Sequence, residues 1–364
     1  MNRRRLITTA IVVGVLAVLV YFQVREWRRF DWVKFKEGTE GVNYWRVLGA
    51  VLIVYFADFL RAIRWKIFLH PTAPDSNWKA LISPQYIGFA ATALLGRPGE
   101  VVRPYLIAGR LNLTLASQMA VWAVERIFDT GAVTVILLFD IFAVPSVRDI
   151  DYYEQFRQAG FALGGVFSFF LLLALTFGLF GRQIGRYLCD KLTPVAPNFA
   201  SNLEKRLRSF SEGLHTVRGP AELFKLSIIS LGMWLLMALA YREVTHAYPI
   251  ETGFHDLDLP QVILLMGATI VGGVMQLPVI GGGAQLASIA VLDKVFDMGP
   301  ELAVSCGMLL WLVTFMSVIP LGLLLTRREH ISLRTLEEEA EEAESLSPQR
   351  TPCEEDELAD QRGS

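Results

Sequence analysis

The sequence predicts an all-α integral membrane bundle of about eight transmembrane segments. Three observations support this fold class. Hydrophobic residues make up 53% of the 364 residues, and the mean hydropathy is +0.40, which is too high for an ordinary soluble domain. The apolar residues gather in runs close to the roughly 20 residues that a helix needs to span a bilayer. Two of the runs are interrupted by glycine and proline, which indicates segments that enter the membrane without crossing it as one helix.

Six uninterrupted apolar runs predict full spans. The first follows the basic segment Met1–Arg5, and no small-residue cleavage site comes after it, so we expect a retained span rather than a signal peptide. The six predicted spans are Leu6–Phe22, Tyr44–Leu60, Ser117–Val144, Ala159–Phe180, Leu223–Val244 and Ala303–Thr326.

Positive charge orients the predicted bundle. The segments Arg61–Lys79 and Arg182–Pro220 are rich in lysine and arginine, so they are expected to be cytoplasmic. Thr245–Leu259 has neither and is expected outside. The exception is Gln23–Asn43, which carries five basic residues on the outer side. The overall prediction is an inner-membrane protein with both termini in the cytoplasm.

Two further apolar segments are interrupted. Ala80–Leu95 runs into a string of charged residues, glycines and prolines, and Pro260–Val295 is broken by Pro278 and Gly281–Gly283. With the sides given above, each segment enters and returns on one side, and the two do so from opposite faces. We expect re-entrant hairpins or pairs of short helices within an inverted repeat of two units; the alternative is two helix kinks without a functional role.

The end of the chain differs in charge from the rest. From Arg327 onward there are five basic and twelve acidic residues, a net charge of −7, so the preceding residues carry +5 of the total of −2. We therefore divide the chain into a membrane domain, residues 1–326, and an acidic cytoplasmic tail, residues 327–364, that is expected to be disordered.

The string Gly96–Leu106 is the first candidate for a binding site. It places Arg97, Glu100 and Arg103 within seven residues, beside two glycines and two prolines. A charged side chain at membrane depth is costly, so it usually marks a pathway for a substrate or ion, or an ion pair. Glu100 and Arg103 share a helix face, so Glu100 is the expected counter-charge of Arg103. The alternative is that these charges only fix the topology.

A second group of charges lies within the predicted span Ser117–Val144. Glu125, Arg126 and Asp129 fall in one turn and a half, where Arg126 and Asp129 can pair and Glu125 and Asp129 share a face. These residues are candidates for binding a polar substrate within the membrane, or alternatively for a structural ion pair between helices.

Two motifs beside the second span complete the charged residues. Asp58 and Arg61 are expected to pair, and Arg64 with Trp65 is typical of an anchor at the membrane interface.

The late glycines Gly281, Gly282 and Gly283 form the third candidate. Their backbone N–H groups, at the start of a following helix, can face an anion; the alternative is close helix packing through small residues. We expect no cofactor and no metal, because the five histidines form no ligand cluster and Cys189, Cys306 and Cys353 have no metal spacing. A phosphate-binding loop, a dinucleotide fingerprint and a nucleophile elbow are all missing from the sequence.

The motifs together resemble a known family. Gly96–Leu106 fits the pattern GR-x-GE-x-x-R-x-x-L, Arg61–Trp65 fits R-x-x-R-W, Glu125–Asp129 fits ER-x-x-D, and Pro278–Gly283 is similar to a late Pro-Gly-Gly break. Taken in their order along the chain, the four motifs resemble those of the lysylphosphatidylglycerol synthase transmembrane, or flippase-like, family. The family commonly has a glutamate after the glycines, where Gln285 and its neighbours stand here.

The resemblance implies a role in moving or holding a lipid rather than aminoacylating it, since nothing after Thr326 provides a soluble synthase domain. We therefore expect a lipid transporter or flippase, not an enzyme, whose partners are anionic or phosphate-bearing membrane lipids and not nucleic acid. Arg97, Arg103 and Arg126 would hold the headgroup. The alternatives are a lipid-modifying enzyme with Glu100 or Asp129 as general acid or base, and a scaffold that transports nothing.

Overall fold

The computed structural model describes residues 31–70, 72–192, 219–273 and 282–329. All regular elements in these ranges are helical, as the fold class requires. The predicted span Leu6–Phe22, the glycine Gly281 and the acidic tail beyond Glu329 lie outside the described residues.

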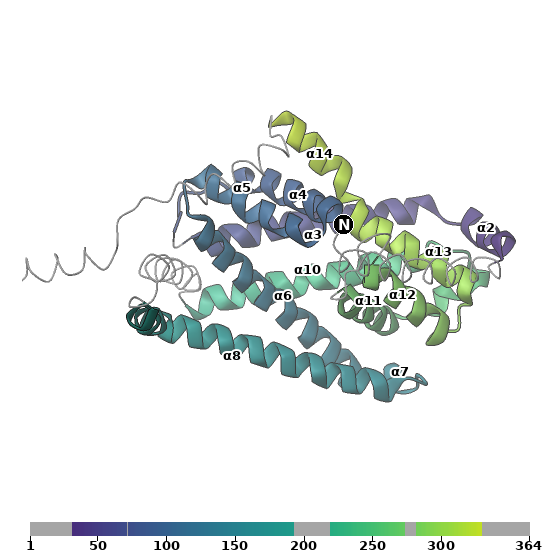
Figure 1. Ribbon diagram of the computed structural model, residues 1–364. Coiled ribbons are helices and arrows are strands. Elements are labelled where there is room, and N and C mark those ends of the chain that lie inside the picture. Colours follow the sequence, from purple (N-terminus) through teal and green to yellow (C-terminus); the bar gives the residue numbers. More distant parts are fainter. Residues whose placement is uncertain (1–30, 71, 193–218, 274–281, 330–364) are drawn as a thin grey trace, which may run out of the picture.

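The described helices follow one another along the chain, and Figure 1 shows them packed as a bundle. They are α2 (Trp32–Glu40), α3 (Tyr44–Leu69), α4 (Trp78–Leu95), η1 (Arg97–Val101), α5 (Val102–Leu111), α6 (Leu115–Ala143), α7 (Pro145–Arg148), α8 (Tyr153–Leu192), α10 (Pro220–Thr245), η2 (Ile250–Thr252), η3 (Phe254–Asp256), α11 (Leu259–Gly273), α12 (Gly282–Lys294), α13 (Pro300–Trp311), η4 (Leu312–Met316) and α14 (Val318–Arg328).

The long helices agree with the predicted spans except for α3 and α8. Helix α3 continues to Leu69 and α8 to Leu192, so the predicted ends at Leu60 and Phe180 are wrong, while the cytoplasmic placement of Arg61–Lys79 stays a prediction. Helix α3 continues because its arginines are paired inside the bundle instead of being solvated. By length and apolarity, α10 and the helical stretch 300–328 are long enough to cross a membrane, and α11 is a shorter apolar helix. Helices α3 and α6 reach 26 and 29 residues but carry charged side chains.

The first interrupted segment is a helical hairpin. Helix α4 ends at Gly96, whose φ of +72° is strained for any residue with a side chain. Beyond this break α5 runs back along α4: Arg103 lies against Gly88, and Arg110 Nη1 donates to the Ala80 carbonyl at 2.8 Å. The start of α4 and the end of α5 therefore lie at the same end of the bundle, as expected of a segment that enters and returns.

The second interrupted segment also forms two helices that pack on each other. At the end of α11, Gly272 lies against the carbonyl of Gly283 and the side chain of Ala287 in α12, so closely that a Cβ on Gly272 would approach both to 2.5 Å. Small residues let the two backbones approach in this way.

The last predicted span contains a local distortion that the sequence does not reveal. Residues Leu312–Met316 form a π-helical turn between α13 and α14. The Tyr55 hydroxyl of α3 donates to the Ser317 carbonyl at 2.6 Å directly after this turn. Beyond it, Gly322 of α14 lies directly against Tyr86 and Ala90 of α4.

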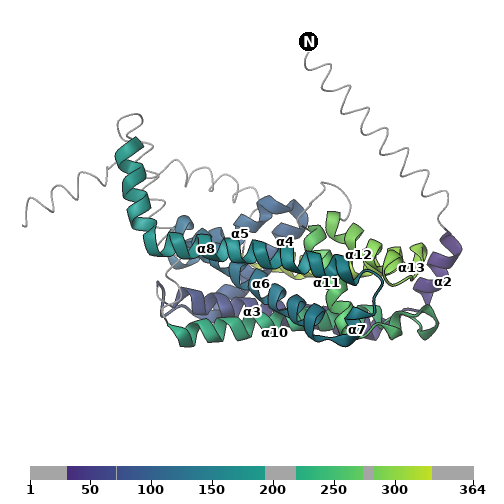
Figure 2. The same ribbon diagram turned by 90° about the horizontal axis from the view of Figure 1, so that it is seen from below.

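The two halves of the bundle have the same order of elements. One half is α3, the α4–α5 hairpin and α6; the other is α10, the α11–α12 pair and α13–α14. Helix α3 packs along α10, α14 packs on α4, and α11 packs on α6, where Gly267 meets Leu137. These contacts are the ones that two related units make, and the inverted repeat itself stays a prediction. Helix α8 lies along α6 at the edge of the bundle (Figures 1 and 2).

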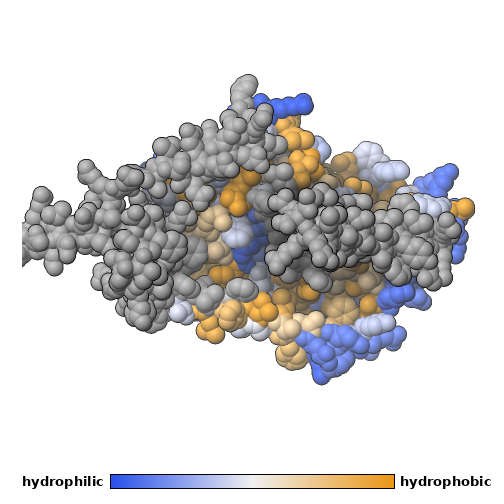
Figure 3. All heavy atoms as spheres, in the orientation of Figure 1, coloured by the Kyte–Doolittle hydropathy of each residue, from blue (hydrophilic) through white to orange (hydrophobic). Residues whose placement is uncertain are grey.

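The outward faces of the helices are apolar. Figure 3 shows hydrophobic side chains over much of the visible described surface, with hydrophilic ones mainly towards its ends. Exposed leucines and phenylalanines recur along α3, α6, α8, α10 and α14; examples are Phe56, Phe139, Phe169, Phe224 and Leu324. Such faces are suited to contact with acyl chains, since lipid tails are as apolar as these side chains.

Candidate functional site

Arg64 is the centre of a buried network of polar groups that joins three helices. It extends from α3, and none of its side chain is exposed. Its Nη1 donates to Asp129 Oδ1 at 2.6 Å and to Ser230 Oγ of α10 at 2.7 Å, and its Nη2 donates to Glu125 Oε1 at 2.7 Å. Burial of this charge is possible because two carboxylates of α6 accept its hydrogen bonds.

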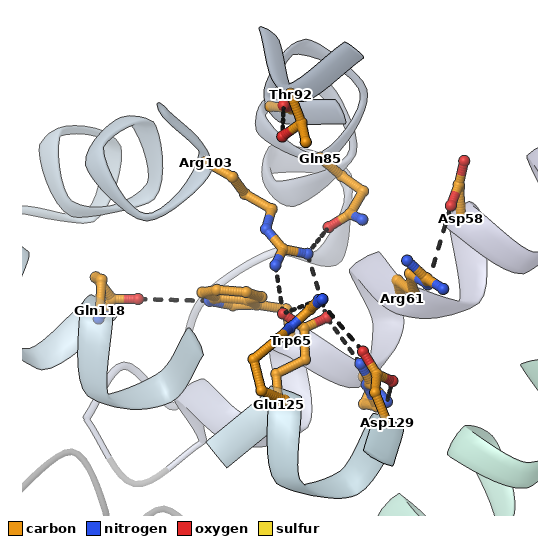
Figure 4. A network of polar contacts seen from close by, with 12 residues as sticks. Asp58, Arg61, Trp65, Gln85, Thr92, Arg103, Gln118, Glu125 and Asp129 are labelled. Atoms are coloured by element: carbon orange, nitrogen blue, oxygen red, sulfur yellow. Dashed lines mark hydrogen bonds and ion pairs between the residues drawn. The ribbon is translucent and has the colours of Figure 1, made fainter. Parts of the chain in front are cut away.

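Arg103 joins the α4–α5 hairpin to the same carboxylates. Its Nη1 donates to Gln85 Oε1 at 3.1 Å and to Glu125 Oε1 at 3.2 Å, and its Nη2 donates to Glu125 Oε2. The guanidinium also lies over the Trp65 ring, 4.3 Å from its centroid. Figure 4 shows this side chain above Trp65 and directed at Gln85 and Glu125.

Arg126 is the more accessible arginine of the network, with 41% of its side chain exposed. Its Nη2 lies 3.2 Å from Asp129 Oδ2, as the spacing of the two residues predicts, and 3.7 Å from Glu125 Oε2. The Trp234 indole N–H of α10 is 3.4 Å from Asp129 Oδ1 on the other side of that carboxylate.

Arg61 and Asp58 lie about one and two turns before Arg64 on α3. Arg61 Nε is 4.0 Å from Asp58 Oδ1, which confirms the predicted ion pair at long distance. The Arg61 guanidinium lies between two aromatic rings, 5.2 Å from the centroid of Phe89 and 5.6 Å from that of Trp234. In Figure 4 it stands apart from the Arg103–Glu125 group and is directed towards Asp58.

A cavity of about 260 Å³ lies beside this network. Its walls come from both halves of the chain and include three arginines, two carboxylates and three aromatic rings. The described lining residues are Val54, Asp58, Arg61, Gly88, Phe89, Thr92, Glu100, Arg103, Trp122, Arg126, Met237, Thr314, Phe315 and Val318. No group of three or more histidines, cysteines, aspartates or glutamates suited to a metal occurs within the described ranges.

A comparison with protein families gives one match over most of the chain. The lysylphosphatidylglycerol synthase TM region matches residues 6–322, which include every described residue that lines the cavity. The chain belongs to this family. The comparisons with curated proteins and with solved structures gave no match.

Membership of the lysylphosphatidylglycerol synthase TM region family confirms the resemblance predicted from the motifs. Together with the apolar helices, it makes the chain a membrane protein with a lipid-related role. Residues of three of the four family motifs lie together in space. They are Arg61 and Arg64 of R-x-x-R-W, Arg103 of GR-x-GE-x-x-R-x-x-L, and Glu125 with Asp129 of ER-x-x-D, and they belong to the buried network or line the cavity beside it.

Two expectations about this network are wrong. Arg103 is paired with Glu125, and not with Glu100, which lines the cavity separately. Arg64 and Trp65 are not an interfacial anchor, since 0% and 1% of these residues are exposed. Both errors have one cause: the acceptors on α6 are distant in the sequence, and spacing within a helix does not reveal them.

The remaining candidates lie elsewhere. Gly282 and Gly283 begin α12, and Gly283 packs against Gly272, which agrees with the small-residue packing alternative. None of the described lining residues comes from α11 or α12. Gly281 is outside the described residues, and Arg97 begins η1. The proposed anion-binding role of the glycines is untested.

Several residues of the site have no signal of their own in the sequence. Gln85 and Ser230 are single polar residues in apolar helices, and both are buried hydrogen-bond partners of arginines. Trp234 lies within the apolar run Leu223–Val244, which by itself predicts only a span. A single polar residue within a span indicates only weakly that it bonds to another buried polar group. The indication exists because burying an unpaired polar group costs roughly 2–7 kcal/mol.

Proposed function

We propose that the protein is a membrane lipid transporter, of the flippase type, that handles an anionic lipid headgroup in the cavity described above. The observation that carries this proposal is the cavity lining, where Arg61, Arg103 and Arg126 meet beside aromatic rings within a bundle of apolar helices. A charged cavity at membrane depth is expensive to maintain and indicates a pathway for a polar group.

The size of the cavity supports a headgroup rather than a whole lipid as its occupant. Its volume of about 260 Å³ is below the ~300–1,000 Å³ typical of pockets for drug-sized ligands. The acyl chains would then remain outside, against the apolar faces of the neighbouring helices. Val54, Met237 and Val318 add apolar side chains to the lining of the cavity.

The composition of the walls supports transport. One side comes from α3, the α4–α5 hairpin and α6, and the other from α10 and the π-helical turn before α14. Sites of secondary transporters commonly lie where two such units meet around broken helices. Alternating exposure of the cavity needs movement among the helices of its walls. Two stretches of irregular backbone contribute lining residues: η1, which follows the break at Gly96 and contains Glu100, and the π-helical turn Leu312–Met316, which contains Thr314 and Phe315.

The test is translocation in vesicles. Full-length protein is reconstituted into phosphatidylcholine vesicles that contain acyl-labelled phosphatidylglycerol, and a membrane-impermeant quencher is added outside. The quantity followed is the fraction of label in the inner leaflet that the quencher does not reach. We expect this fraction to fall faster than in protein-free vesicles, with the phosphatidylglycerol chemically unchanged. Conversion of the lipid to a new species would show a lipid-modifying enzyme instead, and neither translocation nor conversion would leave the scaffold alternative.

A matched pair of variants relates transport to the cavity. Thr92 lines the cavity, and its hydroxyl donates to the Gly88 carbonyl within α4. Thr176 makes the same kind of bond to Leu172 in α8, on an exposed position outside the cavity. Thr92→Phe narrows the cavity and is expected to reduce translocation at least about tenfold, a cost of ~1.4 kcal/mol. Thr176→Phe is expected to leave it unchanged. Equal activity of the two variants would contradict the assignment of the cavity.

A further inference from the structure

The arginines near the cavity differ in how fully their N–H groups are used. Both terminal nitrogens of Arg64 and both of Arg103 donate to carboxylate, amide or hydroxyl oxygens. Arg103 is also stacked on Trp65, which leaves its guanidinium little freedom to turn. These two residues are therefore engaged in holding the helices together.

Arg61 has unused hydrogen-bonding capacity. Its closest carboxylate oxygen, Asp58 Oδ1, is 4.0 Å from Nε, beyond hydrogen-bond distance, and Nε has no hydrogen-bond partner among the described residues. The side chain is nevertheless only 11% exposed and lies between Phe89 and Trp234. A buried guanidinium with unused donors beside a cavity is prepared for an incoming acceptor, since leaving such donors unpaired costs free energy.

Arg126 has similar capacity from the neighbouring wall. Its two carboxylate contacts, to Glu125 and Asp129, are made by one terminal nitrogen, Nη2, and its Nε has no hydrogen-bond partner in the part of the chain that the structure describes. It lies near the Trp122 ring, 5.9 Å from the centroid, and is far more exposed than Arg103. Arg61 on α3 and Arg126 on α6 both line the same cavity.

The charge balance around the cavity restricts the kind of anion. Four arginines, Arg61, Arg64, Arg103 and Arg126, are matched by four carboxylates, Asp58, Glu100, Glu125 and Asp129. The site as a whole is neutral, so it attracts an anion through directed N–H groups rather than through excess charge. In such surroundings a singly charged group costs less to desolvate than a doubly charged one.

We propose that Arg61 and Arg126 form the phosphate subsite of the cavity, that its ligand is the singly charged phosphodiester of a glycerophospholipid, and that Arg103 is a positioning residue. This inference rests on the proposed function, and it differs from the prediction made from the sequence motifs, in which Arg103 grips the phosphate. Two guanidinium groups can donate to the two free oxygens of a phosphodiester, each in a charge-assisted hydrogen bond.

The test measures lipid retained by the purified full-length protein in native mass spectrometry. The probes are phosphatidylglycerol, diacylglycerol with the same acyl chains, and inorganic phosphate as a competitor. We expect retention of phosphatidylglycerol over diacylglycerol, without displacement by millimolar phosphate. Displacement by phosphate would overturn the phosphodiester assignment and identify free phosphate as the ligand.

The variants are Arg61→Gln, Arg126→Gln and, as the matched control, Arg46→Gln, an arginine on α3 that pairs with Glu243 outside the cavity. Each of the first two is expected to reduce retention by roughly tenfold or more, because each removes charge-assisted hydrogen bonds to the phosphate oxygens. The control is expected to retain lipid as the wild type does. Arg61→Lys and Arg126→Lys, which keep the charge, are expected to recover part of the loss.

The outcomes separate this inference from the proposed function. If Arg61→Gln and Arg126→Gln both retain phosphatidylglycerol at the wild-type level while the wild type translocates it, the subsite is refuted and the transport function stands. If the wild type does not translocate lipid but the variants lose retention, the function fails and the subsite stands. Thermal unfolding of each variant is measured alongside, and the lysine variants replace any glutamine variant that does not fold.

Discussion

The buried network predicts that Arg64 contributes more to stability than any other arginine of α3. We consider Arg64→Met, which keeps an apolar stem of similar length but removes the guanidinium. Three hydrogen bonds of 2.6–2.7 Å are lost, to Asp129, Ser230 and Glu125. Arg103 and Arg126 remain near the two carboxylates but do not replace the bonds that Arg64 makes to each.

The magnitude follows from the burial of the group. Removing one partner of a fully buried ion pair costs about 3–5 kcal/mol, because the remaining charge is left without compensation. At roughly 2–4 °C per kcal/mol for a domain of 150–250 residues, the expected fall in the midpoint of thermal unfolding is on the order of 10 °C. Arg64→Lys keeps a charge but cannot serve both carboxylates in a planar fork, so an intermediate fall is expected.

The assay is thermal unfolding of the purified protein in detergent, with Arg46→Met as the control. Arg46 also joins α3 to a carboxylate, Glu243 of α10, at 3.2 Å, but 39% and 28% of the two side chains are exposed. An exposed pair of this kind contributes ~0–1 kcal/mol, so the control is expected to shift the midpoint by about 4 °C at most. Equal shifts in the Arg64 and Arg46 variants would refute the reasoning from burial.

Two further predictions concern the hairpin and the loop after α10. A Cβ at Gly88 would lie 2.5 Å from that of Arg103, so Gly88→Ala is expected to destabilise the protein by about 1–3 kcal/mol. Gly49 has open space around it, so Gly49→Ala is expected to stabilise the protein by ~0.5–1 kcal/mol. Thermal unfolding checks both, since the two midpoints should shift in opposite directions. Burial, and next the charge of Arg242, lower the pKa of His246 below its ordinary 6.5. The unfolded chain therefore binds the proton first, and stability is expected to fall as the pH drops below about 6.5, less so in His246→Asn, in unfolding measured from pH 7.5 to about 5.

The sequence predicts the parts of this fold that depend on local chemistry. The apolar runs locate the long helices to within a few residues in most cases, and Gly96 marks a real turn of the chain because its φ is positive. The pairing of Arg126 with Asp129 follows from their spacing on one helix.

The remaining features depend on contacts between distant segments. Glu125 accepts from Arg64 and Arg103, which lie 61 and 22 residues away, so neither pairing has a local pattern. For the same reason the sequence predicts a span that ends at Leu60 where α3 continues to Leu69: Arg61 and Arg64 indicate an interface as long as their buried acceptors are not known. The π-helical turn at Leu312–Met316 has no proline or glycine within it to announce it.

The close contact at Gly322 has a mechanical consequence. Because Gly322 has no side chain, α14 lies directly on Tyr86 and Ala90 of α4, and the last helix fits onto the hairpin without a layer of side chains between them. Directly after α14, the carboxylate of Glu329 accepts a hydrogen bond from Arg110 of α5, the second helix of the hairpin. Such an interface has little room to slide, so the α4–α5 hairpin and α14 are expected to move as one rigid body although they belong to different halves of the chain. Arg103 and Val318, which both line the cavity, would then be displaced together relative to α3, α6 and α10.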